Sequence, residues 1–294
     1  MTPVVQKLVL GTAQLGMPYG LANRTGQPSR QEASLVLDVA WGGGIRFFDT
    51  ASAYGSAEEL IGEWIEGHEV TGEVRIVSKG TAKTVDEMET EIRGSLKRLH
   101  IDRLDGYLLH SKENMFANER LEALRQVKGT GLATHVGVSV YEENEALSAL
   151  EADLDYIQVP YNAFDQRLER ADFFDRAEAS GATIFARSPF LQGLLLMVPE
   201  ALPPHLAVAR PHLEQFIEMS QRHNLSPLEA ALLFACSSRA QHIIFGAESQ
   251  VQVGEVLAIV KNKAMPVDLL EEIRESFQNL DSSIVDPRVW KKQS

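Results

Sequence analysis

The chain has 294 residues and a formal net charge of −13 at pH 7, so it can bury a large core and is too acidic to favour nucleic acid as its partner. Its single cysteine, Cys236, excludes an intrachain disulfide. No apolar run approaches the roughly 20 residues of a membrane span, and the start MTPVVQKLVL lacks the features of a secretion signal, so we expect a cytoplasmic protein without a membrane partner.

Eight short apolar runs of strand length recur along the chain. Each is continuously apolar rather than alternating, which is typical of parallel strands that are covered on both faces. The runs are residues 7–11, 45–49, 74–79, 105–110, 133–139, 155–159, 182–187 and 242–246.

Helix signals separate most of these runs. Ser29 and Glu32 have the spacing of a capping box, and residues 84–87 and 226–229 repeat it. Residues 249–252 begin a fourth helix. Eight strands that alternate with helices predict an α/β fold, a (β/α)8 TIM barrel, with a doubly wound open sheet as the main alternative. No low-complexity linker divides the chain, so we expect a single domain over residues 1–294.

Polar residues close three neighbouring strand candidates. Asp49 ends the second run, Lys79 the third and His110 the fourth, and Tyr54 follows in the loop after the second. Taken singly, each has a structural interpretation: a helix cap, a solvated lysine or a packed core histidine. Active sites of such barrels lie at the carboxyl ends of the strands, so four functional side chains at matched strand ends indicate a site.

The chemistry of the four residues is mutually consistent. A tyrosine is a poor acid at neutral pH, and a cation within about 4–6 Å makes it a better one. Lys79 is the candidate cation, and Asp49 would keep it charged and in place. His110 could orient a substrate carbonyl by hydrogen bonding. Such a set is suited to protonating an oxygen on which negative charge develops.

The sequence resembles the aldo-keto reductase superfamily. Residues 49–55, DTASAYG, match the family's Asp-Thr-Ala-x-x-Tyr-Gly, and Lys79 and His110 match its lysine and histidine. The resemblance implies an NAD(P)H-dependent oxidoreductase that reduces an aldehyde or ketone, with Tyr54 as the proton donor supported by Asp49, Lys79 and His110. Further matches follow the family's order along nearly the whole chain: GTAQLG at 11–16, GVS at 137–139, QVPYN at 158–162, SPFLQGLL at 188–195 and GAES at 246–249.

The same matching implies where the cofactor, NADPH or NADH, would lie. The carboxamide would meet Ser139 and Gln158, the segment 188–193 would cover the pyrophosphate, and the segment 246–252 would hold the adenosine end. A helix N-terminus after the eighth strand suits phosphate on independent grounds. The full set of cofactor candidates is Gly11, Thr12, Asp49, Ser139, Gln158, Arg187, Ser188, Pro189, Gly193, Gly246, Glu248, Ser249 and Gln252.

Several positions depart from the family pattern. Val140 stands where Asn is frequent, and the seven residues before the first strand leave no room for the usual N-terminal hairpin. Arg187 replaces the aromatic residue that stacks on the nicotinamide. A guanidinium can also stack on a ring, or its charge can recruit an anionic substrate. At the adenosine end Val256 replaces a frequent Asn, and Glu248 stands where a cation is usual.

The family mostly prefers NADPH, but Glu248 does not suit that preference. A carboxylate repels the phosphate of NADPH, whereas an acidic residue accepts hydrogen bonds from the free ribose of NADH in other dinucleotide folds. Glu248 could instead simply favour the helix N-terminus, with Arg239 or Lys261 supplying the missing cation. We expect a weaker NADPH preference than usual.

Other functions remain open from the sequence. The chain could be a regulatory protein that binds the cofactor with little turnover, as in channel-associated β subunits, or an aldolase with Lys79 as its Schiff-base lysine. A metal site is not expected, because the histidines lack ligand spacing. The small-molecule substrate would be chosen by loops at 16–29, 111–120 and 194–211. Of these, the first carries Tyr19, Asn23 and Arg24 and would suit a polar or sugar-like compound. Neither substrate identity nor oligomeric state can be inferred.

Overall fold

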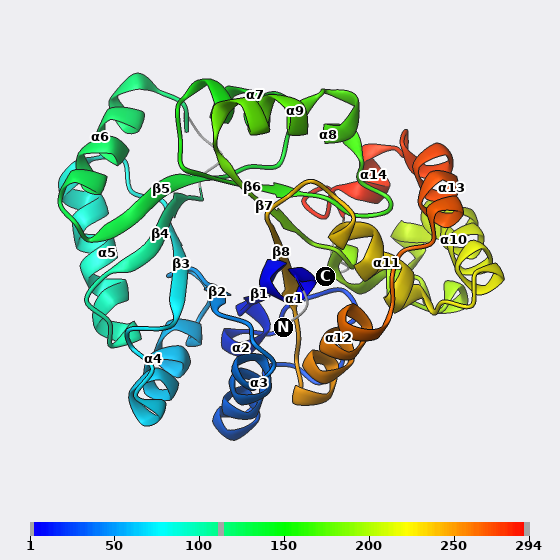
Figure 1. The fold of residues 1–294 in the computed structure, drawn as a ribbon, viewed down its shortest axis with the longest axis horizontal. Coiled ribbons are helices and arrows are strands. Elements are labelled where there is room, and N and C mark those ends of the chain that lie inside the picture. Colours follow the sequence, from blue (N-terminus) through cyan, green and yellow to red (C-terminus); the bar gives the residue numbers. More distant parts are fainter. Residues whose placement is uncertain (1–2, 111–114, 291–294) are drawn as a thin grey trace.

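The strands form a closed parallel barrel. The computed structural model describes residues 3–110 and 115–290, and within them each strand pairs with the next and the last pairs with the first. This confirms the predicted TIM barrel, whose succession of colours is visible around the ring in Figure 1. The strands are β1 (Leu8–Gly11), β2 (Phe47–Asp49), β3 (Arg75–Gly80), β4 (Leu104–Leu109), β5 (Ala133–Ser139), β6 (Tyr156–Pro160), β7 (Thr183–Arg187) and β8 (His242–Gly246).

Helices surround the barrel and connect successive strands (Figure 1). The α-helices are α1 (Pro3–Lys7), α2 (Ala13–Gly16), α3 (Arg30–Gly42), α4 (Ala57–His68), α5 (Val85–Leu99), α6 (Asn118–Gly129), α7 (Glu143–Glu151), α8 (Arg167–Arg170), α9 (Phe173–Ser180), α10 (Arg210–Arg222), α11 (Pro227–Cys236), α12 (Gln250–Asn262), α13 (Val267–Phe277) and α14 (Ser282–Val285). Three 3-10 helices, η1 (Leu191–Leu196), η2 (Pro199–Ala201) and η3 (Pro204–Ala209), lie between β7 and α10.

The predicted helix starts are confirmed. Ser29, Thr84 and Ser226 each accept the backbone N–H of the glutamate three residues later, and that glutamate accepts the N–H of the cap residue. Ser249 begins α12 by accepting the N–H of Gln252. A further capping box at Glu142, which begins α7, was not predicted, because glutamate is not among the usual N-cap residues.

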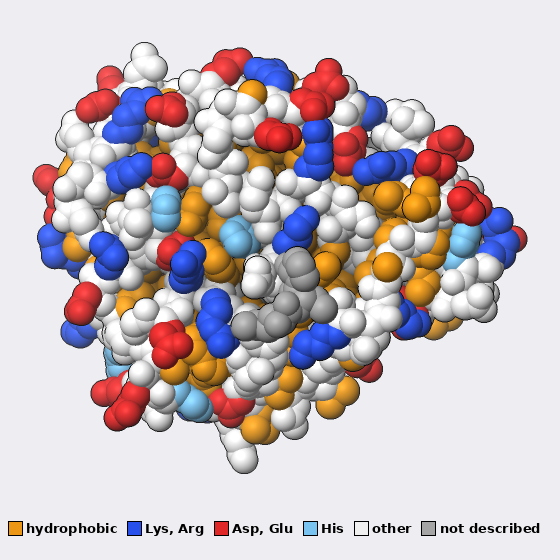
Figure 2. All heavy atoms as spheres, viewed as in Figure 1, with side chains coloured by type: hydrophobic (Ala, Val, Ile, Leu, Met, Phe, Trp, Pro, Cys, Tyr) orange, Lys and Arg blue, Asp and Glu red, His pale blue; other side chains and the backbone are white. Residues whose placement is uncertain are grey.

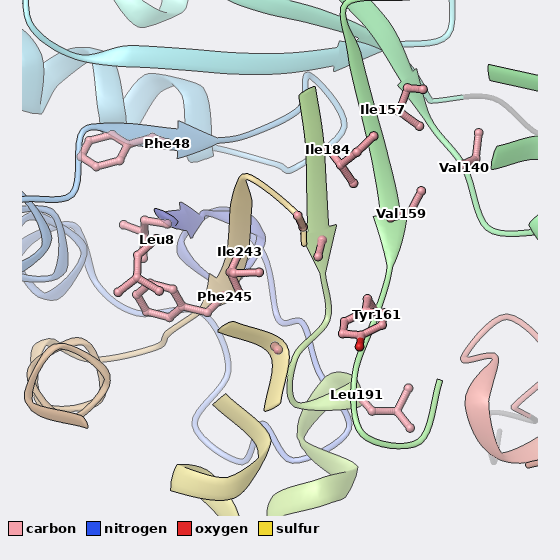
Figure 3. Packing of buried hydrophobic residues seen from close by; sticks show 14 of the residues in the cluster. Leu8, Phe48, Val140, Ile157, Val159, Tyr161, Ile184, Leu191, Ile243 and Phe245 are labelled. Atoms are coloured by element: carbon pink, nitrogen blue, oxygen red, sulfur yellow. The ribbon is translucent and has the colours of Figure 1, made fainter. Parts of the chain in front are cut away.

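The continuous apolar runs reflect burial on both faces of each strand. In β8, Ile243 and Phe245 pack outward toward the helices, while Ile244 joins the cluster that fills the barrel interior. Figure 3 shows the outward set, in which Ile243 and Phe245 lie beside Leu8 of β1. Alternate residues therefore enter two different apolar layers, and both layers require an apolar side chain.

The residues before β1 form α1. Val5 is fully buried, α1 packs against α12 and β8, and Lys7 Nζ donates to the Ser238 carbonyl at 3.2 Å. In Figure 1 this short helix lies at the centre of the ring of strands. Residues 3–7 thus form a short helix at the position of the family's N-terminal hairpin, for which the sequence was expected to leave no room.

Surface charge is mixed on the face shown in Figure 2, where lysine and arginine side chains are interspersed with carboxylates. None of the helices in residues 3–110 and 115–290 is long and apolar enough to cross a bilayer.

Candidate active site

Two glycines determine the position of Tyr54. The turn between β2 and α4 packs backbone to backbone against the end of α2, and a Cβ on Gly16 would lie 1.8 Å from the Tyr54 carbonyl oxygen. A Cβ on Gly55 would lie 2.1 Å from the Gly16 carbonyl oxygen, and Gly55 has φ of +55°, in the left-handed region that favours glycine. The glycines that end GTAQLG and DTASAYG therefore allow two segments to meet closely enough to present Tyr54 above β2.

Lys79 connects Tyr54 to Asp49. The side chain of Lys79 is fully buried, and its ammonium donates to Asp49 Oδ2 at 2.7 Å, to the Thr50 carbonyl at 2.9 Å and to Tyr54 Oη at 3.4 Å. Three acceptors match the three protons of an ammonium group. The lysine is thus held in one orientation beneath the phenol.

The hydrogen-bond chain continues to β5 and β6. The second carboxylate oxygen of Asp49 accepts Gln158 Nε2 at 2.8 Å, and Gln158 Oε1 accepts the Ser139 hydroxyl at 2.9 Å. Ser139 and Gln158 are register partners across β5 and β6. A buried polar chain thus joins these two residues to Tyr54 through Asp49 and Lys79.

Lys79 is a cation in this setting. Burial lowers the pKa of its ammonium, but the charges and hydrogen bonds of Asp49 and Tyr54 raise the pKa above its ordinary value. An attacking Schiff-base lysine must be a neutral amine. The aldolase alternative is therefore disfavoured, because Asp49 stabilises the form that cannot attack a carbonyl.

His110 lies beside the Tyr54 ring. It follows β4 directly, and its backbone N–H donates to the Gly80 carbonyl at 2.8 Å. Its ring stands edge-on to the Tyr54 ring, with centroids 6.4 Å apart. Both side chains line the same cavity, so the predicted grouping of Asp49, Tyr54, Lys79 and His110 is present.

Glu58, which follows the Tyr54 turn, is a structural residue. It is buried in α4, where it accepts the Ser78 hydroxyl at 2.6 Å and pairs with Arg98 at 2.6 Å. Ser78 immediately precedes Lys79 on β3, so this contact ties α4 and α5 to the strand that carries the lysine.

A cavity of about 280 Å³ extends from the catalytic cluster to the start of α12. Lys79 lies buried beneath it. Ser249 is not among its lining residues, and its hydroxyl caps α12. The sequence-predicted residues that line it are Gly11, Thr12, Asp49, Tyr54, His110, Ser139, Gln158, Arg187, Ser188, Pro189, Gly193, Gly246, Glu248 and Gln252.

The cavity suits an extended dinucleotide. One end has the buried hydroxyl and amide of Ser139 and Gln158, and the other has the N-terminus of α12. Gly246, at the end of β8, also lines the cavity, and a Cβ there would come within 2.4 Å of the Gln14 side chain. The missing side chain leaves room for Gln14 at the wall of the cavity.

The loop after β7 covers part of this cavity in an unusual backbone conformation. Ser188, Leu191 and Gln192 all have positive φ although none is glycine, and such strain concentrates at ligand sites. The Gln192 carbonyl accepts the N–H of Leu21 at 3.0 Å, and a Cβ on Gly193 would lie 2.5 Å from the Ala22 side chain. The segment after β1 and the segment after β7 thus meet over the cavity.

Three polar lining residues were not predicted: Gln14, Tyr141 and Glu255. A sequence signal existed for Glu255, because it lies three residues after Gln252 on the helix that residues 249–252 begin. Of the residues in the first substrate loop, Tyr19 and Asn23 line the cavity, but the Asn23 amide is engaged with the loop backbone at Gly26. Residues 111–114 of the second predicted substrate loop lie outside the described residues.

The end of the cavity at the start of α12 is acidic. Glu248 and Glu255 both line it, and burial raises the pKa of Glu248, whose carboxylate accepts the Thr25 hydroxyl at 3.4 Å. Arg239 pairs with Asp175 at 2.6 Å, and Lys261 lies in the last turn of α12, far from its N-terminus. Neither is among the lining residues, so neither supplies the cation that the sequence left open.

Arg187 is the single lysine or arginine that lines the cavity within the described part of the chain. It is the last residue of β7, at the catalytic end, and no carboxylate of the described residues pairs with it. Residues 3–110 and 115–290 contain no cluster of three or more histidine, cysteine or acidic side chains with the geometry of a metal site.

Comparison with known proteins agrees with this geometry. The family model described as "Aldo/keto reductase family" matches residues 7–276. Aldo-keto reductase str7 of Strobilurus tenacellus is 23% identical over 272 residues, which cover 83% of this chain and 79% of that protein. Aldo-keto reductase YhdN of Bacillus subtilis is 30% identical over 147 residues, 44% of this chain and 43% of YhdN.

A solved structure shares the fold. The holo form of aldo-keto reductase AKR11C1 from Bacillus halodurans superposes with a TM-score of 0.77 at 21% identity, covering 92% of this chain and 91% of that one. The family match, residues 7–276, includes all eight strands of the barrel. The chain belongs to the aldo/keto reductase family.

Proposed function

We propose that the protein reduces an aldehyde or ketone to an alcohol with NADH or NADPH. The observation that carries this proposal is the buried hydrogen-bond chain from Ser139 through Gln158, Asp49 and Lys79 to Tyr54. It links the polar pair suited to a carboxamide to a tyrosine suited to proton donation. A protein that only bound the cofactor would have no need of the lysine and phenol.

The reduced nicotinamide supplies a hydride when bound. Tyr54 donates its phenolic proton to the carbonyl oxygen, which becomes the alcohol, and recovers a proton from solvent. The ammonium of Lys79 stabilises the phenolate that remains, because it lies 3.4 Å from Tyr54 Oη. His110 orients the carbonyl oxygen beside Tyr54, and Asp49 keeps Lys79 charged.

The test of the reaction is Tyr54→Phe, which keeps the ring and removes the proton donor. Fluorescence titration should give a cofactor Kd close to that of the original protein, while kcat for carbonyl reduction falls about 10²–10⁴-fold. A variant with undiminished turnover would exclude Tyr54 as the acid. Tight cofactor binding without turnover of any aldehyde, ketone or sugar by the unmodified protein would favour the regulatory alternative.

We further propose that NADH is used at least as well as NADPH. Two carboxylates, Glu248 and Glu255, line the adenosine end of the cavity, and no lysine or arginine of the described residues lines that end. A 2′-phosphate beside them is repelled, whereas a ribose hydroxyl can donate to Glu248. The Thr25 hydroxyl donates to the Glu248 carboxylate at 3.4 Å.

Glu248→Lys tests this preference. The ratio of the NADH Kd to the NADPH Kd should rise about tenfold or more, because one phosphate contact changes from repulsive to attractive. Glu73→Lys makes the same charge change at an exposed residue before β3, at the opposite end of the barrel, and should leave the ratio unchanged. An original protein that binds NADPH about a hundredfold more tightly than NADH, roughly 2.7 kcal/mol, would refute this role of Glu248.

A further inference from the structure

The guanidinium of Arg187 is held on a rigid support at the catalytic end of the cavity. Its central carbon lies 4.1 Å from the centroid of the Tyr141 ring, and Nη2 donates to the Val140 carbonyl at 3.0 Å. Nη1 makes a longer contact of 3.4 Å with the Ser188 hydroxyl. Stacking on an aromatic face and a fixed hydrogen bond orient the planar group.

This cation has no carboxylate partner. No Asp or Glu oxygen of residues 3–110 and 115–290 lies within 4.0 Å of the Arg187 nitrogens. The acid that senses its charge is Asp165, and both oxygens of Asp165 accept bonds from Arg167, at 2.7 and 3.0 Å. Arginine has five N–H donors, and two of them on Arg187 are engaged.

A second arginine near the same ring shows the contrast. The guanidinium of Arg288 lies 4.2 Å from the Tyr141 centroid, but it is paired with Asp286 at 2.6 Å and also contacts Glu142. Arg288 therefore connects the chain after α14 to the start of α7 through ion pairs. Arg187 stacks on the same ring, but it lines the cavity and is not paired with a carboxylate of the described residues.

The free charge lies close to the proton donor. Arg187, Tyr141, Tyr54 and His110 line one cavity, and Tyr19 lies among them. Burial and the neighbouring phenol of Tyr54 raise the pKa of Tyr19, Arg187 lowers it, and Tyr141 raises it again. Because Arg187 and Tyr54 line the same cavity, one small molecule can contact both groups.

We propose that Arg187 binds the anionic group, a carboxylate or a phosphate, of the carbonyl substrate. A planar guanidinium with unused donors matches two oxygens of such a group, and the adenosine end of the cavity, lined by Glu248 and Glu255, repels it. The substrate is then an aldehyde or ketone whose anion is directed to Arg187 while its carbonyl reaches Tyr54 and His110. This inference rests on the proposed reductase activity.

The experiment compares matched substrate pairs with and without the anion. For the unmodified protein, kcat/KM should be at least about tenfold higher for 4-carboxybenzaldehyde than for 4-nitrobenzaldehyde, and higher for glyceraldehyde 3-phosphate than for glyceraldehyde. Arg187→Gln should reduce the preference for the anion about 10- to 100-fold, as expected for loss of a charge-assisted pair. The pair with the larger loss identifies carboxylate or phosphate as the preferred anion.

Two further variants separate geometry from charge. Arg187→Lys keeps the charge without the planar fork and should retain only part of the preference, and Tyr141→Leu removes the support and should reduce it without any change in charge. Arg103→Gln is the matched control, because Arg103 is exposed before β4 at the other end of the barrel, and it should leave the preference unchanged.

The outcomes distinguish the inference from the function on which it rests. An original protein that reduces neutral aldehydes without preferring anionic ones overturns the role of Arg187 but keeps the reductase. If Arg187→Gln weakens NADH binding as much as it lowers kcat/KM, with the substrate ratio unchanged, Arg187 serves the cofactor and the inference is wrong. Absence of any carbonyl reduction refutes the proposed function itself.

Discussion

Removal of Lys79 should destabilise the protein as well as inactivate it. The side chains of Lys79 and Asp49 are 0% and 6% exposed and meet at 2.7 Å, so Lys79→Met leaves a buried carboxylate that keeps only the Gln158 amide as a side-chain partner. Breaking a buried ion pair in this way costs about 3–5 kcal/mol. Because a domain is stable by only about 5–15 kcal/mol, the loss should be plain in an unfolding experiment.

A double-mutant cycle isolates the pair. Asp49→Asn leaves the ammonium of Lys79 without its carboxylate and should cost a similar amount, whereas the double variant removes both charges together. The double variant should therefore be more stable than the sum of the single effects predicts, by at least about 2 kcal/mol. Urea unfolding followed by tryptophan fluorescence, with the slope m compared across the four proteins, measures these free energies.

The same cycle should show no such coupling in activity. Tyr54 loses its cation in either variant that lacks Lys79, so turnover should stay low in the double variant even where stability returns. Additive losses of stability, within about 0.5 kcal/mol, would show that Lys79 and Asp49 are not coupled. A double variant with restored turnover would show that Lys79 acts only to hold the fold.

Two further predictions concern pH and the Tyr54 turn. The folded protein raises the pKa of Lys79, so it binds that proton more tightly than the unfolded chain. This contribution to stability is fully present below about pH 10.4 and is lost as the pH rises through the folded pKa. Above pH 10 the free energy of unfolding, measured with urea, should thus fall more steeply with pH for the unmodified protein than for Lys79→Met. Equal pH dependence in the two proteins would contradict the pKa shift. Gly55→Ala places a Cβ against the Gly16 carbonyl at a positive φ, and should cost more than about 1 kcal/mol and lower kcat. Gly129→Ala, where nothing lies within 4 Å, is its control and should not destabilise.

Strand positions could be predicted because the barrel buries both faces of every strand. The middle of a run such as HIIFG is then apolar, and polar residues with a chemical role are expected at the carboxyl end of the strand. The same reasoning located Asp49, Lys79 and His110. Their convergence follows from the closed order of the strands rather than from proximity in sequence.

Residues contributed by helices and crossing loops were harder to predict. Nothing in the sequence around Tyr141 indicates its contact with Arg187. Gln14 lines the cavity at a place where Gly246 has no side chain to occupy the same space. Ser249 illustrates the opposite case, since one hydroxyl could meet either a phosphate or the helix backbone, and in the structure it accepts the Gln252 N–H. Such choices depend on distances between segments that a local pattern does not contain.

The charges of the cavity are arranged by function rather than by the net charge of the chain. A formal charge of −13 would disfavour any anion, yet the catalytic end contains Arg187 without a carboxylate partner among the described residues, while the acidic pair Glu248 and Glu255 lies at the other end. Lys79 adds little field of its own because Asp49 compensates it at 2.7 Å. The uncompensated cation is therefore Arg187, and it stands where the family's usual aromatic residue would contribute no charge. An anionic substrate and a cofactor without a 2′-phosphate are the two ligands that this polarity favours together.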